Sequence, residues 1–99
     1  MARFDVYTNP SGQGFVLDVQ ADVLSGLNTR IVVPLLQKAD APTPLSRLNP
    51  IFGIADKPHV MLTQFMAAIP ASLISSPVTN LAARDTDIMA ALDMVLVGF

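Results

Sequence analysis

A run of 26 residues, 58–83, carries no Asp, Glu, Lys or Arg, and it restricts the folds open to the chain more than any other feature. The run is nominally long enough to cross a bilayer as a helix. Pro58, Pro70 and Pro77 interrupt it, however, and its polar side chains would each need a partner in hydrocarbon. Those side chains are Thr63, Gln64, Ser72, Ser75, Ser76, Thr79 and Asn80. The run therefore predicts buried β-strands joined by a turn and argues against a membrane span.

The balance of apolar and charged side chains predicts a protein that binds other proteins. Of the 99 residues, 52% are hydrophobic and 14% are charged, against roughly 25% charged in an ordinary soluble domain. The length fits one domain, residues 1–99, which is too small to bury all of this apolar area within itself. We expect another copy of the chain or a different protein to cover the rest. A net charge of −2 disfavours direct binding to nucleic acid.

The lack of cysteine and the lack of an apolar N-terminal run limit the chemistry and the location that we expect. The chain has no cysteine, which excludes a disulfide framework, a thiolate metal site and a cysteine nucleophile. Its N-terminus carries charged residues without an apolar run between them, so it does not resemble a secretory signal. We expect a cytoplasmic protein without a cofactor.

The first quarter of the chain alternates in the manner of a β-hairpin. Residues 3–8 and 15–24 show the two-residue period of strands, and residues 9–14 form a turn rich in Gly, Pro and Asn. In the second strand we expect Phe15, Leu17, Val19 and Ala21 on the core face, with Val16, Asp18, Gln20 and Asp22 on the other. Val23 and Leu24 follow as an adjacent apolar pair at the strand end.

The middle of the chain predicts further strands around one long loop. Residues 30–36 read as a buried strand that bends at Pro34, which lacks a ladder donor. Residues 38–50 contain three prolines and no period, so we expect a surface excursion. A short strand at 51–54, a turn at Asp56, Lys57 and Pro58, and a long strand at 59–69 follow.

The C-terminal segment predicts one helix with an unusual end. Asn80 can cap a helix over 81–97, and Asp85 and Asp87 lie near its positive end. The last two turns are apolar almost all round, which one sheet cannot cover. We infer that this helix end meets another protein.

The catalytic inventory is thin. His59 is the only imidazole and has no partner at metal-ligand spacing, so we interpret it as a structural strand residue. Arg30 and Arg47 either bind phosphate or, as is commoner, pair with acids. Met89 and Met94 suit core packing and partner binding equally. We therefore assign no catalytic residue and no metal ligand.

The order of these segments resembles the CcdB family of plasmid and chromosomal toxins, the gyrase poisons of type II toxin–antitoxin pairs. The resemblance spans nearly the whole chain. It is carried by Val6, Tyr7, Thr8, Asp18, Val19, Gln20, Asp22, Arg30, Val32, Pro34, Leu35, Ser46, Arg47, Pro50, Ile54, Asp56, Met61, Thr63, Met66, Ala67, Pro70, Leu81, Arg84, Asp87, Ile88, Ala91 and Gly98.

The resemblance implies a mainly β fold with a C-terminal α-helix: an SH3-like, partly open antiparallel barrel with a small accessory sheet, assembled as a homodimer. It also implies that the toxin enters the opened gyrase A-subunit dimer and traps the DNA-cleaved state, without covalent chemistry of its own. A CcdA-like antitoxin, folding over the toxin, would reverse this. We expect that contact near residues 9–14 and 38–50.

Gyrase contacts in this family lie on the last helical turn and on the apolar pair after the second strand. The matching positions here are Val23, Leu24, Asp93, Leu96, Val97, Gly98 and Phe99. The best-known members end in Phe-Trp-Gly-Ile, whereas this chain ends in Leu-Val-Gly-Phe, so a large aromatic anchor is missing and Phe99 is its nearest substitute.

Two alternatives stay open from the sequence. The chain is either a homologue that keeps the fold but no longer poisons gyrase, or an RNA endonuclease toxin of the same general fold. The second would need basic residues for phosphate and an acid–base pair, for which Arg30 and His59 are the candidates.

Overall fold

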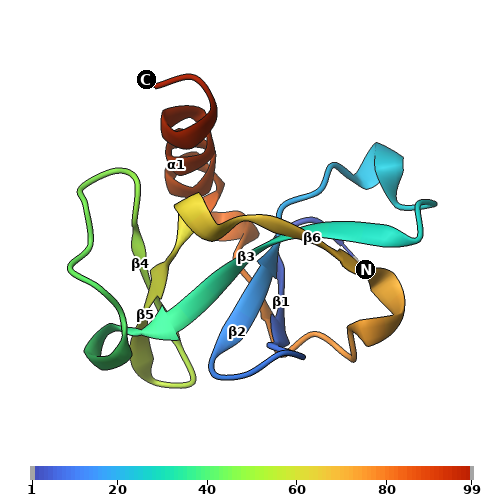
Figure 1. Cartoon of the computed structure of the whole chain (residues 1–99), viewed down its shortest axis with the longest axis horizontal. Coiled ribbons are helices and arrows are strands. Elements are labelled where there is room, and N and C mark those ends of the chain that lie inside the picture. The colour runs from blue at the N-terminus through green and yellow to red at the C-terminus, as the bar shows by residue number, and fades with distance from the viewer. Residues whose placement is uncertain (1, 99) are drawn as a thin grey trace.

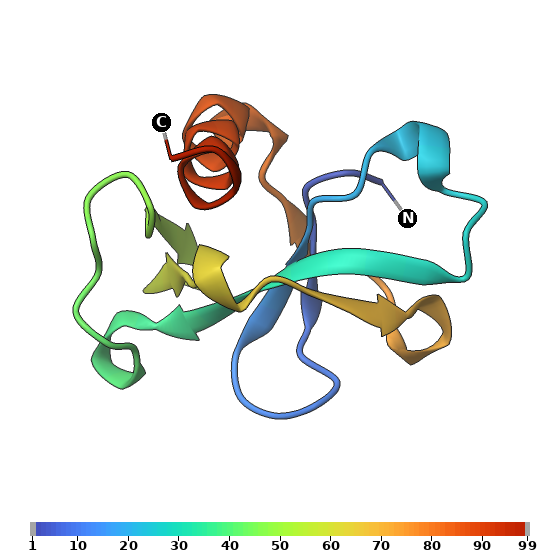
Figure 2. The same ribbon diagram turned by 45° about the horizontal axis from the view of Figure 1, so that its top comes forward.

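The computed structural model describes residues 2–98 and contains a seven-stranded antiparallel sheet followed by one α-helix (Figure 1). The elements are β1 (Asp5–Thr8), β2 (Phe15–Asp18), β3 (Thr29–Gln37), β4 (Ile51–Ile54), β5 (Lys57–Met61), β6 (Ala67–Pro70), β7 (Thr79–Asn80) and α1 (Asp85–Leu96). The strand order is β4-β5-β3-β2-β1-β7, with β6 as an extra strand on β3. The sheet curls into a partly open barrel with α1 against it (Figure 2), which confirms the expected fold class.

β3 organises the sheet because it pairs along both of its edges. β2 covers one edge, whereas β5 and β6 share the other, at Leu35 to Gln37 and at Thr29 to Val32 respectively. The expectation of one long strand over 59–69 was wrong, since a 3₁₀ turn at Thr63–Phe65 divides it. Pro34 explains the break: it has no N–H to donate, and its carbonyl accepts the Leu62 N–H at 2.9 Å.

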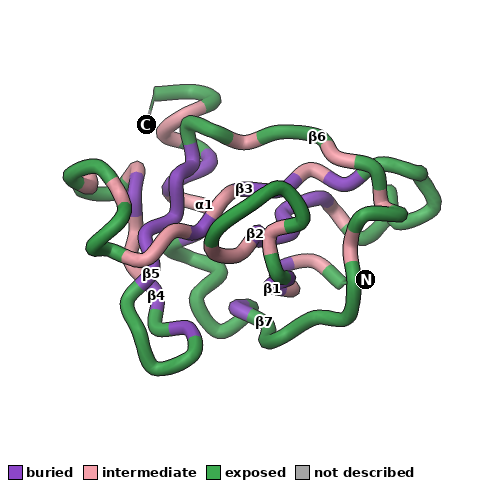
Figure 3. The backbone as a smooth tube through the Cα atoms, turned by 60° about the horizontal axis from the view of Figure 1, so that its bottom comes forward, coloured by how far each residue is buried: buried purple, intermediate pink, exposed green. Residues whose placement is uncertain are grey.

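The main core lies between the curled sheet and one face of α1. Ile88, Ala91 and Leu92 of the helix are buried against Val6, Leu17, Val19, Val33, Leu35, Phe52, Ile54 and Met61. A smaller core of Tyr7, Val16 and Val32 lies on the other face of the sheet, where Ile69 and Ile74 pack against it. Both faces of β1, β2 and β3 are therefore covered, and Figure 3 shows their buried positions.

The second core corrects the expected solvent face of the strand at 15–24. Val16, Asp18 and Gln20 are buried, and the strand ends at Asp18, before a 3₁₀ turn at Asp22–Leu24. Burial of Asp18 is tolerated because Arg30, equally buried, donates from Nε and Nη2 to its Oδ2 at 2.9 and 2.6 Å. Burial raises the pKa of Asp18, although the hydrogen bonds from Arg30 and the Gln20 N–H oppose the rise.

Two further boundaries differ from expectation. The tight turn between β4 and β5 lies at Ala55 and Asp56, both with positive φ, so Lys57 and Pro58 belong to β5. The helix begins at Asp85, not at 81. Asn80 does not cap α1, whose N-cap is Arg84: its Oδ1 accepts the Ala82 N–H at 2.7 Å, at the start of the 3₁₀ turn Ala82–Arg84 that precedes α1. Segment 38–50 is irregular after a 3₁₀ turn at Lys38–Asp40, as expected.

The uncharged run 58–83 is distributed over β5, β6, β7 and the turns between them. Within residues 2–98, no helix has the length and apolar character needed to cross a membrane.

Candidate functional site

The two segments expected to contact another protein converge on one groove. It encloses about 290 Å³ between the 3₁₀ turn at Asp22–Leu24, the sheet and the C-terminal half of α1. The lining residues are Arg3, Val19, Gln20, Ala21, Leu24, Ile31, Met66, Met89, Leu92, Asp93 and Leu96. Residues about 70 positions apart in the chain thus form one largely apolar surface with a cation and an anion at its border.

The helix end is exposed because the core covers α1 only as far as Leu92. Ile88, Ala91 and Leu92 are buried, whereas Leu96, one turn beyond Leu92 on nearly the same face, lies past the core, and Leu96 and Val97 are 68% and 60% exposed. The helix stops at Leu96 because Gly98 adopts a φ of +93°, and its N–H reaches the carbonyls of Asp93 and Met94 at 3.1 Å. The protein thereby presents two large apolar side chains at the capped end of α1.

The opposite wall is a short turn held by a buried amide. Gln20 donates from Nε2 to the Leu24 carbonyl at 2.9 Å, and its Oε1 accepts the Ile31 N–H at 3.0 Å. This clamp fixes the turn to β3 while its apolar residues face outward: Val23 is 88% exposed and Leu24 47%. Exposed apolar side chains on a clamped turn are typical of a protein-binding surface.

Arg3 joins the two walls. Its backbone N–H binds Asp22 Oδ1 at 2.9 Å at the turn, and its guanidinium reaches the Val19 carbonyl at 3.2 Å and Met89 Sδ at 3.4 Å. The same guanidinium lies 4.9 Å from the centre of the Phe4 ring. Arg3 therefore ties the N-terminus to the turn and to α1.

The structure groups three of the seven expected contact residues in the groove: Leu24, Asp93 and Leu96. Val23, Val97 and Gly98 do not line it, but they are exposed beside it on the same turn and the same helix end. Phe99 lies outside the described residues. Sequence reasoning missed Arg3 and Met66, because nothing local in the sequence signals that they meet the helix. For Met89 the sequence allowed both core packing and partner binding; in the structure it is half-buried and lines the groove.

The candidate residues for catalysis are structural. His59 is 2% exposed, its Nδ1 lies 2.9 Å from the Lys57 carbonyl, and its ring contacts Phe15 edge-on. Arg30 is fully buried in its pair with Asp18, which confirms ion pairing over phosphate binding. The part of the chain described here contains no cluster of three His, Cys, Asp or Glu side chains placed to hold a metal.

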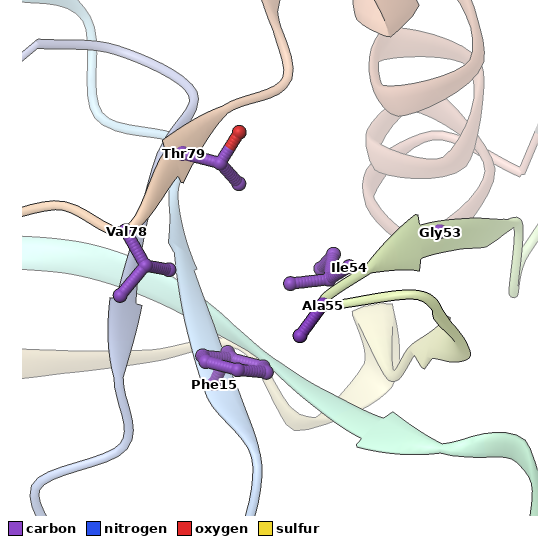
Figure 4. A pocket seen from close by; sticks show the side chains of 6 residues that line it. All are labelled: Phe15, Gly53, Ile54, Ala55, Val78 and Thr79. Carbon is purple, nitrogen blue, oxygen red and sulfur yellow. The ribbon is translucent and has the colours of Figure 1, made fainter.

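A second cavity, of about 260 Å³, lies at the open seam of the barrel. Phe15, Gly53, Ile54, Ala55, Val78 and Thr79 line it (Figure 4), so β4 and β7, the two unpaired ends of the strand order, face each other there. The Thr79 hydroxyl is the one polar side-chain group on its wall. The cavity thus offers no acid–base pair and reflects incomplete closure of the sheet.

Comparisons with known proteins agree with this fold. A family model described as CcdB protein matches residues 3–98. Among solved structures, the chain resembles an endoribonuclease in complex with its cognate antitoxin from a mycobacterial species, with a TM-score of 0.77, 16% identity and coverage of 97% of this chain and 94% of that one. It also resembles the Mycobacterium tuberculosis toxin MazF-mt6, with a TM-score of 0.74, 14% identity and coverage of 92% and 94%. At such low identity these two structures establish the fold alone.

Proposed function

The chain belongs to the CcdB family of toxins, and from this premise we propose that it poisons DNA gyrase. It binds the gyrase A subunit and holds the enzyme–DNA complex in its cleaved state, acting as a binding protein and not as an enzyme. A CcdA-like antitoxin neutralises it.

The observation that carries this proposal is the exposed apolar helix end beside the groove. Leu96 and Val97 are large, apolar and more than half exposed, on a helix that the core otherwise holds firmly. Burying the exposed part of each in a partner would gain about 1–2 kcal/mol. Leu24 and Val23, across the groove, extend the same surface.

The missing tryptophan sets the expected strength. Tryptophan is among the commonest interface hot spots, and this chain has none. Its terminal Leu-Val-Gly-Phe offers aliphatic side chains and one phenylalanine instead. We expect binding weaker than that of members ending in Phe-Trp-Gly-Ile, and a homologue without any gyrase binding is the alternative.

Fold similarity to an endoribonuclease that binds a cognate antitoxin raises RNA cleavage as a second candidate. The residues that sequence analysis offered for that chemistry, Arg30 and His59, are both buried and already bonded to neighbouring protein groups. Neither reaches a phosphate on the surface as the protein stands. The net charge of −2 argues in the same direction.

The test measures binding and cleavage together. The purified protein should bind a gyrase A fragment directly and raise the amount of DNA trapped on gyrase as covalent complex. Deletion of 97–99 and Leu96→Glu should each reduce both effects by tenfold or more. Leu73→Glu should not, although it places the same charge on another leucine that is more than half exposed, at 53%. Binding without trapping, or neither, would identify the non-poisoning homologue. Cleavage of RNA by the purified protein would identify the endonuclease.

Dimerisation and antitoxin binding are parts of the same proposal. Large apolar side chains remain exposed over much of the surface, among them Leu27, Leu45, Phe65 and Val78 at 52–61%. A second copy would cover part of this area. Light scattering should give twice the chain mass of 10.6 kDa. Co-expression with the cognate antitoxin should suppress toxicity, with contacts on the loops at 9–14 and 38–50.

A further inference from the structure

A polar pocket on another face of α1 brings two arginines together without serving the groove. It encloses about 370 Å³ between the end of segment 38–50 and the start of the helix. Ser46 and Arg47 line it from the segment, Arg84 and Asp87 from the helix side. The four polar residues belong to the set that carries the family resemblance, yet none of them lines the groove proposed to bind gyrase.

Arg84 is held in place on one side of this pocket. It donates from Nε and Nη2 to Asp87 Oδ2 at 3.1 and 2.8 Å, and its guanidinium lies 4.8 Å from the centre of the Phe52 ring. Because Asp87 neutralises its charge, Arg84 contributes oriented donors more than net charge.

Arg47 differs in that nothing in the described chain engages its side chain. It is exposed and makes no hydrogen bond or ion pair with residues 2–98. Its backbone φ of 72° lies in the left-handed region, which is costly for a residue with a Cβ. A strained backbone that presents an unpaired cation at a pocket points to a ligand.

A buried network maintains the strain at Arg47. Asn49, only 5% exposed, accepts the Leu45 N–H at 3.0 Å and donates to the Met61 carbonyl and to Gln64 Oε1 at 3.0 and 2.8 Å. The Thr63 hydroxyl donates to the Leu48 carbonyl on the same turn. These bonds hold the backbone of the turn on both sides of Arg47.

We propose that this pocket binds a carboxylate of an acidic peptide segment in a partner protein, with Arg47 as the charged contact and Arg84 and Ser46 as additional donors. A guanidinium binds a carboxylate through two parallel hydrogen bonds, which suits a pocket with one unneutralised cation. Nucleic acid fits less well, because its affinity depends on several phosphate contacts and the chain carries a net charge of −2. Because Ser46 and Arg47 belong to segment 38–50, the proposal rests on the antitoxin contact proposed for that segment and does not depend on the gyrase assignment.

The test uses full-length protein and a hexaglutamate peptide, with hexaglutamine as the uncharged control. Titration with hexaglutamate should shift the side-chain Nε–H NMR signals of Arg47 and Arg84 to saturation, and titration with hexaglutamine should not. Arg47→Gly should weaken binding about tenfold, the loss of one charge-assisted contact. Lys38→Gln, which removes one positive charge elsewhere on the same segment, should leave binding unchanged.

Arg47→Gly also separates folding from binding. Glycine adopts a positive φ without strain, so the thermal midpoint of the variant should be no lower than that of the wild type. Binding to the gyrase A fragment should also be unchanged, because Arg47 lies outside the groove. Equal binding of both peptides, no binding at millimolar peptide, full binding by Arg47→Gly, or preferential binding of a single-stranded RNA oligonucleotide would each overturn the proposal.

Discussion

The two arginine–aspartate pairs of this protein have nearly the same geometry and opposite surroundings, which makes their contribution to stability predictable. In each, Nε and Nη2 of the arginine share one carboxylate oxygen. The side chains of Arg30 and Asp18 are 0% exposed, whereas those of Arg84 and Asp87 are 47% and 53% exposed. Burial is therefore the main difference between the pairs.

Asp18→Asn leaves the Arg30 guanidinium buried without a counter-charge, and Arg30 Nη1 already has no hydrogen-bond partner within the described chain. Removing one partner of a buried pair costs about 3–5 kcal/mol. At about 4–8 °C per kcal/mol for a domain of this size, the thermal midpoint should fall by at least about 12 °C. Asp87→Asn should cost no more than about 1 kcal/mol, because water solvates the freed arginine.

Urea unfolding followed by circular dichroism measures both costs at neutral pH. A third variant, Asp18→Leu with Arg30→Met, removes both buried charges and should recover much of the loss, since it leaves no uncompensated ion. Equal costs for Asp18→Asn and Asp87→Asn would refute the reasoning that burial determines the value of the pair.

Three further outcomes are expected. Burial first, and then the negative charge of Asp5, raise the pKa of Tyr7 to about 12. Because a tyrosine in the unfolded chain ionises near 10, the contribution of Tyr7 to stability should be constant below about pH 10 and fall as the pH rises towards 12. The phenolate absorbance of this single tyrosine should show a midpoint near 12, and a midpoint near 10 would show that its ring is solvated. Gly14→Ala should lower the free energy of unfolding in urea by about 1–3 kcal/mol, because φ at Gly14 is +79° and the new Cβ would overlap the Leu35 carbonyl oxygen of β3. Gly12→Ala should be neutral, and equal effects of the two substitutions would contradict this reasoning. Ile88→Ala, fully buried on α1, should cost about 2–5 kcal/mol, while Leu96→Ala should change stability by less than about 0.5 kcal/mol, and a large loss at Leu96 would give that side chain a structural role.

Local patterns predicted most elements because the chain signals them with short-range chemistry. Alternation located β1 and β2, β-branched residues located β3, and the apolar period located α1 to within a few residues. Features that depend on distant partners were not predictable. Asp18 looked like a solvent-facing acid because its counter-ion, Arg30, lies 12 positions further on. The break at residue 62 follows from Pro34 on the neighbouring strand and from nothing within 59–69.

The same distinction holds for the candidate site. The helix end could be singled out from sequence because apolar residues on all faces of a helix cannot be buried by one sheet. Its meeting with the turn at Asp22–Leu24 could not, since the groove depends on how β2, β3 and α1 pack. Arg3 illustrates the limit: its three contacts join residues 16, 19 and 86 positions away, and no periodicity encodes such a bridge.

The arrangement of α1 separates the two proposed sites and makes them independently testable. On α1, Met89, Asp93 and Leu96 line the groove. Asp87 and Ala90 line the polar pocket that also contains Arg47 and Arg84. Since the buried face of the helix holds both in place, a core substitution should weaken both, while a surface substitution should weaken one. A partner that binds the polar pocket lined by Arg47 and Arg84 therefore need not displace a protein already bound in the groove.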